Sequence, residues 1–127
     1  MPNILIVDDD DDIRRVLRRI LETDGHAVVD CANGHDALLA MGTRRPDLVI
    51  TDVYMPEMDG IEFLVHLRER DPDLPVLAVS GGSLATADFV LEDASQLGAN
   101  AVLTKPFDID EMRQTVRRLL GGGPSGR

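Results

Sequence analysis

The hydrophobic and polar positions of the chain fall into two alternating kinds of segment. Short runs of apolar residues, rich in valine and isoleucine, are typical of strands covered on both faces of a parallel sheet. Longer segments between them carry apolar residues three and four positions apart, which is typical of helices with one buried face. The predicted strands are 3–7, 26–31, 48–52, 75–80 and 101–104. The predicted helices are 13–21, 34–44, 61–69, 84–97 and 109–120.

This strict alternation predicts an α/β fold, in which helices cover both faces of a doubly wound five-stranded parallel sheet, a (βα)5 arrangement with right-handed crossovers. Four of the predicted strands exit on residues suited to phosphoryl chemistry, whereas the second ends at Cys31. Ligands bind such sheets beyond the carboxyl ends of the strands, where the winding direction reverses. The pattern therefore favours the flavodoxin-like order 2-1-3-4-5, with the second strand at the edge and the first and third at the centre.

The length of 127 residues fits one domain with a full hydrophobic core, for which we expect residues 3–120. A content of 43% hydrophobic and 28% charged residues is typical of a globular protein rather than a disordered one. The glycine-rich residues 121–127 are expected to form a flexible C-terminal tail or a truncated linker.

Charge and cysteine content exclude several functions. A net charge of −10 argues against direct nucleic-acid binding by this domain, because phosphate contacts need an excess of lysine and arginine. Cys31 is the only cysteine, so no internal disulfide can form, and a cytoplasmic location is expected. The N-terminus passes directly into an apolar strand without a basic region or a long apolar segment, so we expect neither a signal peptide nor a membrane span.

Five consecutive aspartates separate the first predicted strand from the first predicted helix. Asp11 and Asp12 are explained as the helix cap, where their charge also favours the helix dipole. Asp8 and Asp9 come earlier, at the exit of the first strand, and the third strand exits on Asp52. Because strands 1 and 3 are neighbours in the predicted sheet, Asp9 and Asp52 should lie side by side.

Carboxylates crowded in this way repel one another unless a cation lies among them. Hard oxygen ligands at a partly open site favour Mg²⁺ or Mn²⁺, which keep several waters and share their coordination with a phosphate. We expect Asp9 and Asp52 to bind the metal directly and Asp8 to act mainly through water. A carboxylate that touches a divalent cation is also a possible nucleophile toward phosphorus. Ser80 and Lys105, at the exits of the fourth and fifth strands, would then bind the oxygens of the transferred group.

Together these residues resemble the receiver domain of two-component response regulators. The resemblance extends over nearly the whole chain, roughly residues 3–120. It rests on four stretches, which are Val7-Asp8-Asp9, Asp52-Val53-Tyr54-Met55-Pro56-Glu57-Met58-Asp59-Gly60, Val79-Ser80 and Lys105-Pro106-Phe107. A chemotaxis protein of this family is among the known examples of the 2-1-3-4-5 strand order, so the predicted topology and the resemblance are not independent.

The resemblance implies that Asp52 accepts a phosphoryl group, in a Mg²⁺-dependent reaction, from a sensor histidine kinase or a histidine phosphotransfer protein. It implies that Asp9, Asp52 and the backbone carbonyl of Tyr54 bind the metal. It also implies that Lys105 pairs with the phosphoryl group and that Ser80 reorients toward it. Such a protein is a signalling phosphoacceptor rather than an enzyme, because it catalyses only its own phosphorylation and dephosphorylation.

The signal is expected to leave through the loop after Ser80 and through the face built by the predicted elements between residues 84 and 120. The signal would pass to an output partner protein or a missing output domain. The chain itself would be a monomer or a phosphorylation-dependent dimer. The arginines of the first and last predicted helices lie on one side of the predicted sheet, and we interpret them as a solvated face. They are Arg14, Arg15, Arg18, Arg19, Arg113, Arg117 and Arg118.

Two departures from the family pattern concern the switch. Family members commonly carry tyrosine or phenylalanine three residues before the lysine, as a rotamer switch coupled to the hydroxyl, and this chain has Val102 there. Valine is stiff at its single χ1 angle, so we expect activation to move the backbone of residues 81–90 instead. Tyr54 and Gly82 occupy the two positions thought to tune the phosphoryl lifetime. The first is bulky and the second has no side chain, so the lifetime does not follow from the sequence.

The main alternative is an enzyme, a phosphatase or phosphotransferase of the haloacid dehalogenase type. Those enzymes also use an aspartate nucleophile, a second aspartate two residues on, a serine or threonine, a lysine and Mg²⁺, and Asp8 with Asp10 satisfies the first motif. Against this alternative, Asp52 and the residues after it would go unexplained, and the chain offers little room for a substrate cap. A receiver-like module that only binds partners is disfavoured, because no aspartate, hydroxyl or lysine of the set is missing.

Overall fold

The computed structural model describes residues 2–53, 60–80 and 98–122, and every structural statement below concerns those ranges. The strands are β1 (Asn3–Val7), β2 (Ala27–Cys31), β3 (Leu48–Asp52), β4 (Val76–Ser80) and β5 (Ala101–Thr104). The helices are α1 (Asp11–Thr23), α2 (Gly34–Thr43), α3 (Gly60–Arg70) and α5 (Ile109–Arg117), and a wider turn, η1 (Arg118–Gly122), follows the last one. The predicted helix 84–97 lies outside the described residues.

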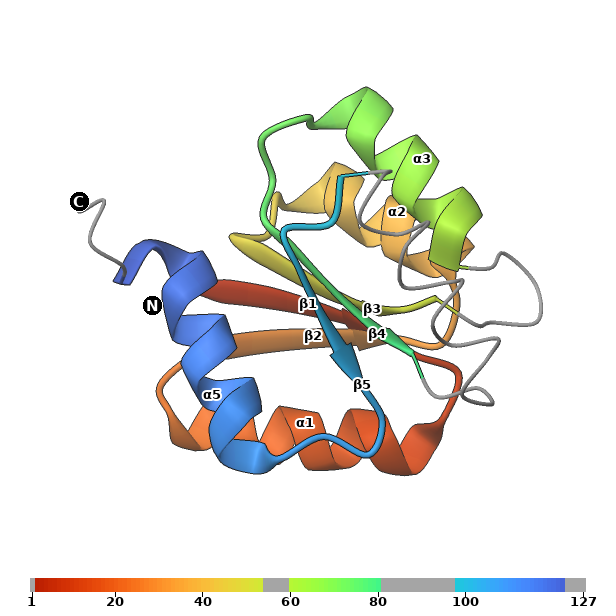
Figure 1. Cartoon of the computed structure of the whole chain (residues 1–127). Coiled ribbons are helices and arrows are strands. Elements are labelled where there is room, and N and C mark those ends of the chain that lie inside the picture. The colour runs from red at the N-terminus through yellow and green to blue at the C-terminus, as the bar shows by residue number, and fades with distance from the viewer. Residues whose placement is uncertain (1, 54–59, 81–97, 123–127) are drawn as a thin grey trace.

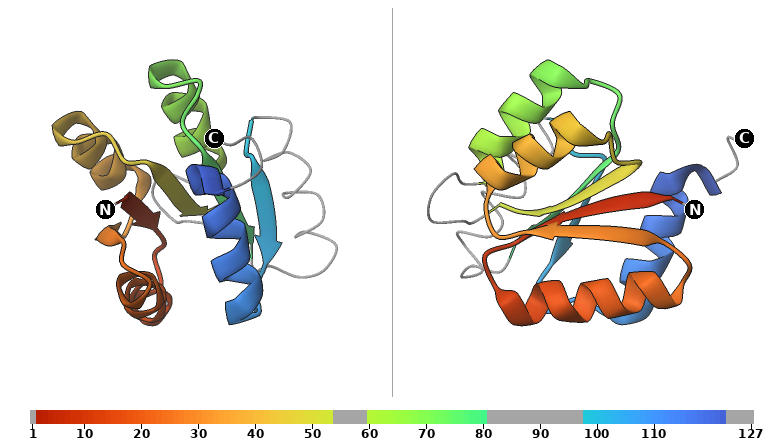
Figure 2. Two further views of the ribbon diagram at one scale, coloured as in Figure 1. Left: turned by 90° about the vertical axis from the view of Figure 1, so that its left-hand side faces the viewer. Right: turned by 180° about the vertical axis from the view of Figure 1, so that it is seen from behind.

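The five strands form one parallel sheet in the order β2-β1-β3-β4-β5, which confirms the predicted doubly wound topology (Figure 1). Helices α2 and α3 lie on one side of this sheet, and α1 and α5 lie on the other (Figure 2). In the central pair, Val7 of β1 is in register with Thr51 of β3. The residues that follow these two positions therefore emerge together at the same edge of the sheet.

The sheet separates two hydrophobic cores, because successive residues of a strand point to opposite faces. Leu5 and Val7 of β1 pack in the core beneath α2 and α3, around the fully buried Phe63. Ile4 and Ile6 pack in the opposite core, against α1 and α5. Because both faces of β1 are buried, its sequence is a continuous apolar run. This buried strand anchors the acidic loop that follows it.

The N-terminus of α1 corrects one prediction about the acidic run. Asp10, not Asp11 or Asp12, is the cap residue, because its backbone is extended and its side chain accepts the backbone N–H groups of Asp12 and Ile13. Asp11 and Asp12 lie in the first turn, where their negative charge still favours the helix dipole. Across the three described ranges, no helix combines the length and apolar character that crossing a membrane requires.

Candidate functional site

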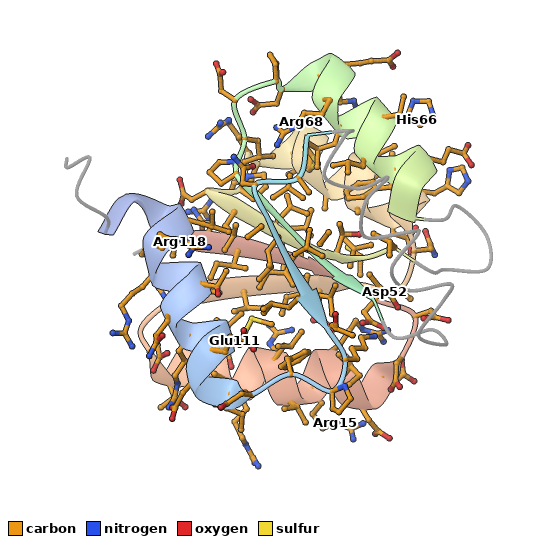
Figure 3. The ribbon with its side chains drawn as sticks, viewed as in Figure 1. Arg15, Asp52, His66, Arg68, Glu111 and Arg118 are labelled. Carbon is orange, nitrogen blue, oxygen red and sulfur yellow. The ribbon has the colours of Figure 1, made fainter. Side chains whose placement is uncertain are left out.

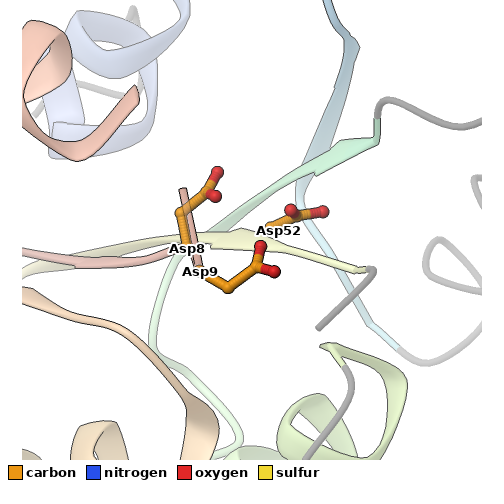
Figure 4. A group of neighbouring side chains, drawn as sticks. All are labelled: Asp8, Asp9 and Asp52. Atoms are coloured by element: carbon orange, nitrogen blue, oxygen red, sulfur yellow. The ribbon is translucent and has the colours of Figure 1, made fainter. Parts of the chain in front are cut away.

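Three carboxylates meet where β1 and β3 end. Asp8 and Asp9 follow β1, and Asp52 is the last residue of β3, its neighbour in the sheet. Each residue offers an oxygen atom, and these atoms all lie within 4.8 Å of one another. Figure 4 shows the three side chains gathered at the two strand ends. The predicted proximity of Asp9 and Asp52 is therefore present in the structure.

The three carboxylates differ in their access to solvent. Asp8 and Asp52 are 3% and 6% exposed, whereas Asp9 lies on the surface. Buried carboxylates are costly unless charged or hydrogen-bonding groups compensate them. The site is thus closed on the side of the sheet and open on the side of Asp9, where a ligand can enter.

Lys105, which follows β5, supplies the positive charge that the two buried carboxylates need. Its Nζ atom lies 2.7 Å from Oδ2 of Asp8 and 3.2 Å from Oδ2 of Asp52. Burial on its own lowers the pKa of this lysine, but the hydrogen bond to Asp8 and the charge of Asp52 outweigh it, so the pKa is raised. Lys105 is the only lysine of the chain, and its peptide bond to Pro106 is cis.

Asp8 is held at several atoms at once. Its Oδ1 accepts the backbone N–H of Asp10 at 2.9 Å, and its own N–H donates to the carbonyl of Cys31 at 3.1 Å. Its carbonyl oxygen accepts a hydrogen bond from Nη1 of Arg14 at 2.7 Å. Arg14 was predicted to lie on a solvated face, and this contact was not predicted, because helical periodicity gives the face of a residue but not the reach of a long side chain.

The donor set fits a hard divalent cation. Within this group of four side chains, three carboxylates face one ammonium, which leaves two negative charges to be compensated. Oxygen ligands in a half-open arrangement suit Mg²⁺ or Mn²⁺, which retain waters and coordinate phosphate oxygens. The three carboxylates are therefore the side chains that could hold such an ion.

The remaining predicted residues are only partly placed. Ser80 ends β4, in register with Thr104 of β5, so its backbone lies at the same edge of the sheet, while its side chain is outside the description. Tyr54 and Gly82 lie outside the described residues. Val102 of β5 is half-buried and packs against the core beneath α2 and α3.

Comparison with known proteins identifies relatives along nearly the whole chain. The response regulator receiver domain family matches residues 4–117. The sporulation initiation phosphotransferase F of Bacillus subtilis is 38% identical over 118 residues, which cover 92% of this chain and 92% of that protein. The KDP operon transcriptional regulatory protein KdpE of Escherichia coli is 41% identical over 117 residues, and the chain spans only 50% of its length.

A solved structure gives the same result for the fold. The receiver domain of NtrX from Brucella abortus superimposes with a TM-score of 0.86 at 31% sequence identity, covering 94% of this chain and 99% of that one. The strand order, the acidic cluster beside Lys105 and the match over residues 4–117 agree with one another. The chain belongs to the response regulator receiver domain family.

Proposed function

We propose that this receiver domain accepts a phosphoryl group on Asp52, in a reaction that requires Mg²⁺ or Mn²⁺. The donor would be the phosphohistidine of a sensor histidine kinase or of a histidine phosphotransfer protein. The observation that carries the proposal is the Lys105 ammonium between Asp8 and Asp52, with Asp9 beside them at an open edge. Family membership supports the same assignment.

The proposed metal ligands are Asp9, Asp52 and the backbone carbonyl of Tyr54, with Asp8 acting through water. A bound divalent ion would neutralise charge on the phosphoryl oxygens and make phosphorus more electrophilic. Asp8 would hold Lys105 and the acidic loop in position, because its two oxygens accept hydrogen bonds from Lys105 and from the backbone N–H of Asp10. Tyr54 enters the proposal through the family resemblance alone, since it lies outside the described residues.

In the proposed transfer, an oxygen of the Asp52 carboxylate forms a bond to phosphorus while the P–N bond of the phosphohistidine breaks. The electron pair of that bond returns to the imidazole ring, which leaves neutral when its other nitrogen carries a proton. Lys105 keeps its own proton, as its raised pKa requires, and its charge stabilises the oxygens of the transferring group. Ser80 would supply a further hydrogen bond. The product is an acyl phosphate on Asp52.

The proposed role is that of a signalling phosphoacceptor, not of an enzyme acting on other substrates. Residues 3–120 would form the working unit and 121–127 a tail or linker. The signal would pass through the loop after Ser80 and the face around β5 and α5 to an output partner or output domain. Val102 would stay in place during the switch, because it is stiff and already packed against the core. The phosphoryl transfer would take place in the cytoplasm, and the protein would act as a monomer or a phosphorylation-dependent dimer.

The alternative with Asp8 as nucleophile is less compatible with the site. Both oxygens of Asp8 accept hydrogen bonds, one from Lys105 and one from the backbone N–H of Asp10, so Asp8 already holds the lysine and the acidic loop in place. A nucleophile needs an oxygen that can reach phosphorus in line with the leaving group. Family membership also accounts for Asp52, which the alternative leaves without a role.

The test is site-specific phosphorylation by a small donor, acetyl phosphate or phosphoramidate, followed by intact-mass measurement. We expect the full chain to gain the mass of one phosphoryl group in Mg²⁺ or Mn²⁺ and none in excess chelator. The Asp52→Asn variant should gain none, whereas the matched Asp8→Asn variant should still be labelled, although more slowly. Undiminished labelling of Asp52→Asn, or loss of the covalent adduct in Asp8→Asn alone, would contradict the proposal.

A further inference from the structure

Helix α1 carries two arginines whose guanidinium groups contact the edge strand of the sheet. Arg14 and Arg18 are four residues apart and therefore lie on the same face of the helix. Both guanidinium groups contact Asp30 of β2, Arg14 through Nε at 3.1 Å from Oδ2 and Arg18 through Nη1 with Oδ1. Arg14, whose side chain is 15% exposed, departs from the predicted solvated arginine face, whereas Arg18 is 44% exposed.

Asp30 is an unusual residue for its position. It lies within the apolar β2 strand, in register with the fully buried Ile6 of β1, and its side chain is 25% exposed. A charged side chain in a strand is unfavourable unless its charge is compensated. Arg14 and Arg18 compensate it at both carboxylate oxygens, so the three residues form one ionic group between α1 and the edge of the sheet.

Arg14 connects this group to the acidic loop. Its side chain is only 15% exposed, and all three of its nitrogens have partners. Nε binds Asp30, Nη2 binds Asp11, and Nη1 donates to the carbonyl oxygen of Asp8 at 2.7 Å. A planar guanidinium bound at every nitrogen has little freedom to rotate, so the Asp8 carbonyl faces a fixed donor.

The Asp8 carbonyl determines how Asp9 is presented. The peptide between the two residues is planar, so a donor that fixes the Asp8 oxygen also fixes the N–H and Cα of Asp9. Asp9 is exposed, and in the described part of the chain no hydrogen bond restrains its carboxylate. The direction in which Asp9 points therefore depends on the backbone that Arg14 holds.

We propose that Arg14, oriented by Asp30, is a positioning residue for the metal site, which it organises through the Asp8 carbonyl. The inference rests on the proposed function, since it concerns the divalent cation of that site. Arg14 does not touch the ion in this arrangement. It sets the position of Asp9 relative to Asp52. Loss of a residue that orients metal ligands by hydrogen bonding typically weakens metal binding by about 10–100-fold.

The sign of the effect separates positioning from simple electrostatics. Removing a positive charge near an acidic cluster should strengthen the binding of a dication if charge alone matters. Loss of positioning should weaken the binding instead. The Arg14→Lys variant keeps the charge but loses the fork that reaches Asp8, Asp11 and Asp30 together, so electrostatics predicts no change and positioning predicts weaker binding.

The experiment measures Mn²⁺ binding to the full chain by the decrease of the free-ion electron paramagnetic resonance signal, without any phosphate donor. We expect the dissociation constant to rise about tenfold in Arg14→Lys, the low end of the range for such hydrogen bonds. Arg14→Gln should bind more weakly as well. The matched controls are Arg15→Lys and Arg15→Gln, because Arg15 is a neighbouring arginine whose side chain is 77% exposed and pairs with Asp12.

Asp30→Asn tests the same guanidinium through its other partner, and its coupling to Arg14→Lys separates positioning from the loss of one negative charge, with circular dichroism to check that each variant folds. Asp30→Asn should weaken Mn²⁺ binding, and combining it with Arg14→Lys should add little, since both act through one guanidinium. A dissociation constant within twofold of wild type in Arg14→Lys, tighter binding in Arg14→Gln, or full additivity with Asp30→Asn would overturn the inference. A merely structural arginine would lower the metal-free unfolding free energy without changing the Mn²⁺ affinity of the folded protein. Failure of wild type to bind Mn²⁺ would instead overturn the proposed function.

Discussion

Lys105 illustrates how one residue can serve two states of the site. Its ammonium bridges Asp8 and Asp52 in the unphosphorylated protein, where it compensates two buried carboxylates. In the proposed phosphorylated protein the same charge would pair with phosphoryl oxygens. Because the chain contains no other lysine, any property of a lysine side chain measured on the whole protein reports on this site.

The raised pKa of Lys105 gives a prediction for stability at alkaline pH. A folded-state pKa above the unfolded value of about 10.4 means that the folded protein holds this proton more tightly. The stabilisation is therefore fully present below pH of about 10.4 and is lost as the pH rises through the folded-state value. In urea unfolding at neutral pH, Lys105→Met should be less stable than wild type by about 1–3 kcal/mol, as expected for hydrogen bonds to charged groups.

The difference between wild type and Lys105→Met should stay constant from neutral pH to about 10 and shrink above it. Groups that titrate in this range and are present in both proteins, such as Cys31, cancel in the difference. Biosynthetic ¹³C labelling of lysine would give one side-chain NMR signal, because Lys105 is the only lysine of the chain, and its titration measures the folded pKa. A stability difference that persists unchanged to the highest pH, or a pKa below that of a free lysine, would contradict this account.

The residues of the site were predictable to different degrees. Asp8, Asp9, Asp52 and Lys105 follow strands directly, so the alternating pattern and the parallel sheet suffice to bring them together. Arg14 was not predictable, because its role depends on the rotamer of a long side chain and on Asp30 at one register position of the edge strand. Periodicity carries no information about either.

Arg68 connects three elements at the opposite end of the sheet from the acidic site. This side chain, labelled in Figure 3, leaves the last turn of α3 and donates to the carbonyl of Gly98, just before β5. It also donates to Oδ1 of Asn100, which in turn accepts the N–H of Val76 at the start of β4. Further acceptors are the carbonyls of Asp71, Pro72 and Leu74. Burial lowers the pKa of this guanidinium.

Two glycines provide a matched test of this arginine. Gly25 and Gly98 both have positive φ, of 94° and 103°, so alanine at either position is strained by about 1–2 kcal/mol. A Cβ at Gly25 would meet nothing within 4 Å, whereas a Cβ at Gly98 would lie 3.0 Å from Nε of Arg68. We expect Gly98→Ala to cost about 1 kcal/mol more than Gly25→Ala in urea unfolding, because it also disturbs hydrogen bonds of Arg68.

A double-mutant cycle identifies the source of that excess. In an Arg68→Ala background, which should itself be destabilised by about 2–3 kcal/mol, Gly98→Ala and Gly25→Ala should have equal effects. An excess that survives the loss of Arg68 would show that the strain at Gly98 has another origin.

Most helices and strands could be predicted from the sequence, but the residues at which some of them begin or end could not be predicted from the local hydrophobic pattern. Strand β2 begins at Ala27 rather than His26, because the N–H of His26 closes the end of α1 by donating to Leu21. The last helix was predicted to reach Leu120, since Leu119 and Leu120 continue its apolar stripe. In the structure regular α-helix ends at Arg117, and both leucines still pack on the core from the wider turn η1. The contact of the two leucines with the core was predictable, but the wider turn in which they lie was not.

The whole molecule combines a rigid sheet with an excess of negative charge at one edge. The polar strand ends favoured the order 2-1-3-4-5, with the second strand at the edge, and the structure confirms this order. The net charge of −10 is uneven. Arg14 and Arg15 of α1 pair with Asp11 and Asp12, whereas Asp8 and Asp52 share Lys105 and Asp9 lies beside them. The fold thus concentrates like charges where a cation is expected, at a cost in stability that a cation should remove.

This arrangement predicts that Mg²⁺ stabilises the folded protein through the acidic site. At 100 times its dissociation constant, an ion that binds only the folded state adds about 2.7 kcal/mol to the unfolding free energy. We expect this gain for wild type in urea unfolding at constant ionic strength, and we expect it to vanish largely in Asp9→Ala. Without metal, Asp9→Ala should be at least as stable as wild type, because one of the crowded carboxylates is gone. Asp12→Ala is the matched control: this aspartate belongs to the same acidic run but pairs with the exposed Arg15 outside the site, so its variant should keep the full gain. A gain of equal size in all three proteins would mean that Mg²⁺ acts by screening the net charge, and no gain in wild type would mean that the three carboxylates do not form a metal site.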